Sequence, residues 1–213
     1  MTFSELQAEV FRRLDEDSSD AAFWSVDDVK TALNEGYEEM SDASEWHEQS
    51  ANLPQLSKRT YYDLRTALGA DSPLTVKHLY NATTRRWIYP GDLRELDYRT
   101  FCQWEEITGE PEQFFLRGLF WLGTFPKATA DSGTIKVYFT ALPPALSDDG
   151  DEPGFSEEYQ YGIVEYAIAD LLAQEAETQK ARAHFSEYLT YEAGLKAWTE
   201  GRISLDRINR LNG

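Results

Sequence analysis

The side chains best suited to catalysis or metal binding are few and scattered. His47, His78 and His184 are far apart in sequence, and Cys102 is the single cysteine. The sequence has no HExxH, CxxC, GxSxG, GxGxxG or P-loop motif. We therefore expect no metal, no cofactor and no enzymatic activity. A lone cysteine also rules out an internal disulfide and suits a reducing cytoplasm.

Acidic residues dominate the charge. The chain carries 38 Asp and Glu against 20 Lys and Arg, a net charge of −18. Among so many carboxylates some pairs reach catalytic spacing by chance, so a carboxylate enzyme ranks last among our interpretations. The loop holding Asp148, Asp149, Asp151 and Glu152 could bind a hard cation, but it lacks EF-hand spacing, and a solvated turn is the default. The acid excess disfavours binding to a phosphate backbone, yet it suits a wall past which DNA slides.

Aromatic residues are unusually frequent, with 6 Trp, 12 Tyr and 11 Phe. Such enrichment is typical of protein interfaces, although core packing also uses these rings. Together with the lack of a catalytic motif, it favours an assembly protein. The alternative is a module that binds a glycan or peptide through Trp87, Trp104 and Trp121.

Helices are predicted at both ends of the chain. Thr2 with Glu5 and Ser25 with Asp28 have the spacing of capping boxes, each followed by an apolar stripe. In the C-terminal part, Ser156 begins a helix that is apolar on more than one face. A second helix follows a polar turn at 175–180 and is predicted to end at Gly201.

Short strands are predicted in the middle of the chain. Residues 75–82 and 85–89 flank a turn at Thr83–Thr84, and residues 134–142 alternate between apolar and polar. Asp92 should cap a short helix that turns Leu93, Leu96 and Phe101 inward. The expected fold class is α+β: a helical bundle from the N- and C-terminal helices with an inserted small antiparallel β domain. The expected parts are N-terminal helices at 1–56, a β-rich insertion at 57–142, C-terminal helices at 143–201 and a docking tail at 202–213.

A set of spaced residues runs through this order of segments. It comprises the helix start Trp24–Lys30 with the run Leu33–Tyr37, then Trp46, the step Tyr62–Leu64, Trp104 with Gly109 and Pro111, the strand Thr134–Leu142 entering Pro143–Pro144, Leu146, Asp148–Asp149, Glu152–Pro153, and the helix start Glu158–Tyr159 with Tyr166–Ala167. In this pattern the chain, from Phe3 to Trp198, resembles the head–tail adaptor (connector) proteins of tailed bacteriophages.

The resemblance implies a virion protein that is not an enzyme. Such a protein would form a homo-oligomeric ring, a dodecamer, beneath the portal protein. The ring would extend the DNA channel and offer a platform to a tail nozzle or tube protein, while genomic DNA passes without specific binding. It would be made in the host cytoplasm, would reside at the head–tail interface and would involve no membrane. The strand-rich middle departs from adaptors that are purely helical.

Two segments are candidate docking sites. The tail after Gly201 carries a charge of +2 and regularly spaced apolar residues, and its candidate docking residues are Arg202, Ile203, Leu205, Arg207, Ile208, Arg210 and Leu211. We expect it to extend and dock onto the portal, as the resemblance implies; folding back onto its own body is the alternative. The tail-facing candidates are Arg85, Arg86 and Trp87, for which an ordinary hairpin tip is the alternative.

Overall fold

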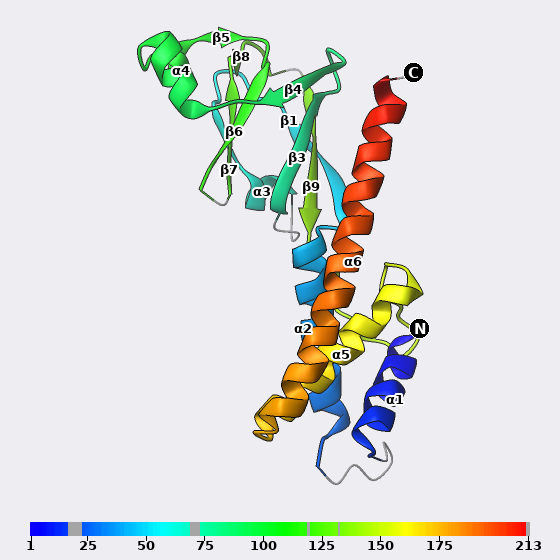
Figure 1. The fold of residues 1–213 in the computed structure, drawn as a ribbon. Coiled ribbons are helices and arrows are strands. Elements are labelled where there is room, and N and C mark those ends of the chain that lie inside the picture. The colour runs from blue at the N-terminus through cyan, green and yellow to red at the C-terminus, as the bar shows by residue number, and fades with distance from the viewer. Residues whose placement is uncertain (17–22, 69–72, 119, 132, 212–213) are drawn as a thin grey trace. The chain divides into compact units, whose positions relative to one another are not determined.

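The computed structural model describes residues 1–16, 23–68, 73–118, 120–131 and 133–211, with side chains up to residue 202. The fold is mixed α+β, as predicted, and divides into two compact units (Figure 1). One unit, here called the helical unit, comprises Met1–His47 and Pro143–Gly213. The other, the sheet unit, comprises Glu48–Leu142.

In its described residues, the helical unit contains four helices: α1 (Phe3–Leu14), α2 (Val26–Ser44), α5 (Glu157–Gln174) and α6 (Thr178–Leu211). Both predicted capping boxes are confirmed. Thr2 accepts a hydrogen bond from the Glu5 N–H and Ser25 from the Asp28 N–H, while each N3 carboxylate accepts from the N-cap backbone. These caps satisfy amide groups that a helix start leaves without partners, so they fix where α1 and α2 begin.

Helix α5 is the centre of the helical core, packed against α1, α2 and α6. Its predicted burial on more than one face is confirmed, because Ile163, Leu171, Val164, Ile168 and Leu172 are all buried. The close approach of α5 to α2 and α6 depends on the missing side chain of Gly162. A Cβ on Gly162 would lie 2.8 Å from Met40 Sδ and 2.8 Å from Tyr191 Cβ.

The sheet unit holds a seven-stranded sheet in the order β1-β9-β3-β4-β6-β7-β2. Its strands are β1 (Glu48–Pro54), β2 (Tyr61–Asp63), β3 (Pro73–Asn81), β4 (Arg86–Pro90), β6 (Gln113–Arg117), β7 (Trp121–Phe125) and β9 (Thr134–Ala141). All neighbours pair antiparallel except β4 and β6, which are parallel. The strands β5 (Thr108–Gly109) and β8 (Lys127–Ala128) form a separate parallel pair. Short helices α3 (Leu64–Leu68) and α4 (Leu93–Thr100) and a 3₁₀ turn (Trp104–Glu106) complete the unit.

The sheet unit begins earlier than the sequence suggested. Residues 48–56 were expected with the N-terminal helices, but β1 pairs with β9 along its whole length, from Glu48 opposite Thr140 to Pro54 opposite Thr134. The segment gave little strand signal because Leu53 is its one fully buried side chain. Because β1 and β9 are paired neighbours, the chain enters and leaves the sheet unit on adjacent strands.

Helix α4 is capped by Asp92, as predicted, but Phe101 at its C-terminal end points outward. Leu96 is buried, whereas Phe101 is 88% exposed, so the expectation that Phe101 faces inward is wrong. Phe101 ends the helix in the left-handed conformation, with a φ of 52°, and this reversal redirects the chain. Trp104 and Phe115 pack with Leu96 in its place.

Helix α6 does not end at Gly201 but continues to Leu211. Among the described glycines only Gly118 has a positive φ, so Gly201 lacks the left-handed conformation that terminates a helix. A glycine inside a helix costs about 1 kcal/mol relative to alanine without breaking it. The expected extended tail is therefore helical over its first ten residues.

Candidate interaction surfaces

The charge of the chain is divided unevenly between the two units. Residues 48–142 contain 11 acidic and 11 basic residues, so the sheet unit is neutral. The helical unit contains 27 acidic and 9 basic residues and therefore carries the whole net charge of −18. The composition shows only that acidic residues are in excess. The boundaries of the two units show that this excess lies entirely in the helical unit.

The predicted docking tail is the end of α6. The Arg202 guanidinium carbon lies 4.6 Å from the centroid of the Trp198 ring, a cation–π contact at a ring that is 38% exposed. Beyond Arg202 the backbone is helical to Leu211, and the side chains of the remaining candidates lie outside the described part of the chain. Docking of this segment onto the portal stays a prediction.

The tail-facing candidates Arg85, Arg86 and Trp87, here called the β3–β4 corner, follow a tight turn. The turn predicted at Thr83–Thr84 is confirmed, since both N–H groups donate to Asn81 Oδ1. Arg85 adopts a φ of 58°. The Arg86 side chain is 70% exposed and reaches Glu110 only at 3.8 Å, a weak surface pair.

Trp87 sits in a cluster of rings on the sheet. Its ring centroid lies 5.0 Å from that of Tyr80, 6.0 Å from Tyr138 and 6.1 Å from His78, and Trp87 remains 39% exposed. Lys136 Nζ lies 4.8 Å from the Tyr138 ring centroid. The corner thus presents a positioned aromatic ring, with Lys136 on the same face of the sheet. Its expected contact with the tail is not tested by this geometry and stays a prediction.

The alternative of an aromatic binding module loses one of its three rings. Trp104 is buried, and its Nε1 donates to Asp97 Oδ1 at 2.8 Å. Its ring packs edge-on against Phe115 at 5.0 Å. Trp104 therefore belongs to a small core, while Trp87 and Trp121 keep substantial exposure.

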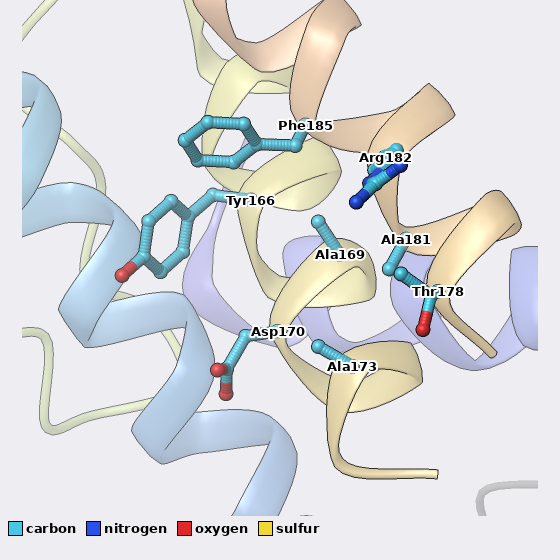
Figure 2. A pocket seen from close by; sticks show the side chains of 8 residues that line it. All are labelled: Tyr166, Ala169, Asp170, Ala173, Thr178, Ala181, Arg182 and Phe185. Atoms are coloured by element: carbon cyan, nitrogen blue, oxygen red, sulfur yellow. The ribbon is translucent and has the colours of Figure 1, made fainter. Parts of the chain in front are cut away.

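A pocket of about 320 Å³ lies between α5 and α6 (Figure 2). Helix α5 contributes Tyr166, Ala169, Asp170 and Ala173, and α6 contributes Thr178, Ala181, Arg182 and Phe185. The small alanines leave an apolar floor, and Tyr166 and Phe185 add two aromatic rings to the lining. Phe185 is 45% exposed at the edge of this pocket. A pocket formed by pairing two helices has no signature in either helix alone.

Carboxylates act on Tyr166, which lines the pocket, and on the neighbouring Tyr188. Burial, and then Glu39 and Glu35 of α2 and Asp170 of α5, raise the pKa of the Tyr166 phenol above its ordinary value. Burial and a hydrogen bond with Glu192 of α6 likewise raise the pKa of Tyr188, whose ring lies 5.2 Å from that of Tyr166. Among the residues that line the pocket, Asp170 is acidic and Arg182 is basic.

The acidic loop before α5 has a structural role. Asp151 Oδ2 accepts the N–H groups of Ser147 and Asp148, both at 2.8 Å, and these bonds hold the pKa of Asp151 below its usual range. The Phe3 N–H donates to the carbonyl of Asp151 at 2.7 Å, which ties the loop to the start of α1. Within the described ranges, no group of three or more His, Cys, Asp and Glu side chains is arranged to hold a metal ion.

A buried ionic contact joins three helices of the helical unit, and sequence reasoning missed it. Glu165 of α5 accepts from Arg13 Nη1 of α1 and lies 2.7 Å from His184 Nδ1 of α6. Arg13 also donates to Glu9 at 2.8 Å. His184 looked isolated because its partner lies 19 residues away on another helix.

Exposed aromatic rings such as Trp87 and Trp121 are typical of surfaces that bind other proteins. No helix in the described ranges has the length and apolar character needed to span a membrane. Comparison with known families supplies the identity: the model described as SU10 adaptor protein matches residues 1–207. The chain belongs to this family of bacteriophage head–tail adaptors. Comparison with curated proteins gave no match.

Membership confirms the predicted resemblance to phage adaptors. It makes the protein a structural component of the virion at the head–tail junction, where it interacts with other head and tail proteins. The family is one of structural adaptors rather than enzymes.

Proposed function

We propose that the protein forms a homo-oligomeric ring, a dodecamer, that joins the portal to a tail nozzle or tube protein and extends the DNA channel. The observation that carries this proposal is the adaptor family match over residues 1–207. The partners are further copies of the chain, the portal and the tail protein. Genomic DNA passes through the ring without being bound specifically.

The distribution of charge supports a role for the helical unit in lining the channel. Affinity for a phosphate backbone comes from Lys and Arg contacts, and this unit has 9 of these residues against 27 carboxylates. Repeated around a ring, a charge of −18 per copy repels DNA from the wall. Repulsion keeps the passing duplex from adhering.

The end of α6 is the proposed contact with the portal. Arg207 and Arg210 pair with portal carboxylates, while Leu205, Ile208 and Leu211 fill a groove between portal subunits. Support comes from the basic, apolar-studded composition of residues 202–213 on an otherwise acidic unit. A ring of such segments multiplies weak single contacts through avidity.

Deletion of residues 202–213 tests the portal contact. The truncated protein should unfold at the same temperature as the full chain but lose capture by purified portal, measured by mass photometry of the mixture. The double variant Arg207→Gln, Arg210→Gln should weaken capture, whereas the matched control Lys180→Gln, Lys196→Gln removes the same charge elsewhere on α6 and should not. Unchanged capture by the truncated protein would refute the docking role.

A further inference from the structure

The division of charge restricts where copies of the chain touch each other in a ring. The helical unit contains 27 acidic and 9 basic residues, whereas the sheet unit contains 11 of each. Like charges brought together across an interface oppose association. Two helical units in direct contact meet this opposition, and two sheet units do not. The sheet unit is therefore the more favourable place for contacts between copies.

Helix α4 of the sheet unit presents two aromatic side chains to solvent. Phe101 is 88% exposed and Tyr98 is 86% exposed, the highest values for large apolar side chains among the described residues. They lie three positions apart, which places them on one side of the helix, whereas Leu96 is buried on another. We call these two residues the α4 ridge. Adjacent exposed rings of this kind are typical of surfaces that bind another protein.

The backbone holds the α4 ridge in place at a cost in local conformation. Phe101 and Cys102 are consecutive residues in the left-handed region, with φ values of 52° and 62°. Bulky side chains rarely adopt this region, and glycine is the usual residue there. Underneath, Trp104 packs with Leu96 and donates to Asp97, so α4 has a fixed support. Strained positions of this kind cluster at functional sites, and a fixed support reduces the entropy lost on binding.

A second aromatic surface lies on β3, β4 and β9 of the same unit. Tyr80 stands opposite Trp87 on one side and Lys136 on the other, and His78 stands opposite Tyr138, so these side chains share one face of the sheet. The Trp87 ring lies 5.0 Å from that of Tyr80 and 6.0 Å from that of Tyr138. We call Tyr80, Trp87 and Tyr138 the aromatic face. Aromatic rings pair favourably with one another in edge-on and offset arrangements.

The two surfaces lie at different places on the sheet unit. Figure 1 shows α4 on one side of this unit, with β3 and β9 on the other. One unit can therefore contact two neighbours at once, one through each surface. A contact between unlike surfaces is head-to-tail, the type that generates a ring when its rotation closes.

We propose that the α4 ridge of one copy packs against the aromatic face of the sheet unit of the next copy. The sheet units, which are neutral, thereby join the ring, and the acidic helical units need not touch. This contact rests on the ring proposed above and names the surfaces that build it. It also assigns Trp87 to the contact between copies instead of to the tail.

Removal of the exposed rings tests the α4 ridge. The double variant Tyr98→Ser, Phe101→Ser should weaken self-association at least about tenfold, because truncation of aromatic anchors is among the costliest changes at an interface. The matched control Phe185→Ser, Leu189→Ser removes two side chains of α6 that are 45% and 46% exposed and should have little effect. The readout is the fraction of ring in mass photometry, with and without portal, after thermal unfolding has confirmed that each variant is folded.

The single cysteine of the chain allows the pairing of the two surfaces to be tested directly. Cys102 is exposed and follows Phe101, so it marks the α4 ridge without any substitution. Lys136→Cys adds a second thiol on the aromatic face. A short bismaleimide should then link neighbouring copies of this variant into a ladder on a denaturing gel. The wild type and the control Lys180→Cys, on the helical unit, should give no ladder.

The outcomes separate this inference from the proposed function. If the Tyr98→Ser, Phe101→Ser variant forms rings as the wild type does, with or without a loss of tail binding, the inference is overturned while the ring stands. The same follows if Lys136→Cys forms rings but gives no ladder, or if only the Phe185→Ser, Leu189→Ser control loses the ring. A wild-type chain that forms no ring with or without portal would defeat the proposed function itself.

Discussion

Glu165 illustrates how one side chain connects elements that are distant in sequence. Its side chain is 8% exposed and contacts Arg13 of α1 and His184 of α6. Glu165→Ala removes the carboxylate that joins α1 to α6, although Arg13 keeps its pairing with Glu9, and we expect a loss of about 2–3 kcal/mol in the free energy of unfolding. The control Glu187→Ala, on the exposed side of α6, should change it by less than about 0.5 kcal/mol. Urea unfolding of the two variants measures the difference, and equal midpoints would contradict the structural role of Glu165.

The lowered pKa of Glu9 predicts how the stability of the fold changes with pH. Hydrogen bonds from Arg12, and also from Arg13, lower the pKa of Glu9 from 4.5 to about 2. A carboxyl group whose pKa is lower in the folded than in the unfolded state stabilises the fold at any pH above its unfolded-state pKa. That contribution is lost as the pH falls toward the folded-state pKa. The stability advantage of the wild type over Glu9→Gln should therefore be complete above about pH 5 and fade between pH 5 and pH 2. Thermal unfolding across this range measures it, and an advantage that persisted unchanged at pH 2 would contradict the assigned ion pairs.

At the scale of elements, two glycines on neighbouring helices should respond in opposite directions. A Cβ on Gly162 would meet Met40 and Tyr191, each at 2.8 Å, whereas a Cβ on Gly201 would meet no atom within 4 Å. Gly162→Ala should destabilise the protein by about 1–3 kcal/mol because the core is overpacked. Gly201→Ala should stabilise it by up to about 1 kcal/mol because alanine favours the helix. Thermal unfolding measures both, and a destabilising Gly201→Ala would contradict the continuation of α6 through this residue.

Local signals predicted most elements, and nonlocal pairing explains the misses. The capping residues Thr2, Ser25 and Asp92 and the alternation of β9 depend on neighbouring residues, so sequence alone predicted them. Strand β1 is polar on one side and forms through its pairing with β9, whose residues lie 80 to 92 positions further along the chain. Phe101 matched an inward stripe, but the left-handed end of α4 redirected it. The α5–α6 pocket and the Glu165 contact need two or three helices to meet, which no local pattern encodes.

At the scale of the whole molecule, the sheet unit should be removable as one piece. It has cores of its own, and its first and last strands pair directly, with Glu48 opposite Thr140. Replacing residues 48–142 with a short Gly-Ser linker should leave a helical unit that unfolds cooperatively, because its core uses none of those residues. A cut at 57 would retain β1 without its partner β9 and should favour aggregation. Circular dichroism and thermal unfolding test both variants, and a non-cooperative 48–142 deletion would contradict two separate cores.

The mass of the complex formed with portal is the most direct test of the proposed assembly. Native mass spectrometry of the full chain mixed with purified portal rings should show twelve added copies per portal ring, bound as one closed layer. Closure is expected although each helical unit carries a charge of −18. A chain that stays monomeric beside the portal, or binds as scattered single copies, would contradict it.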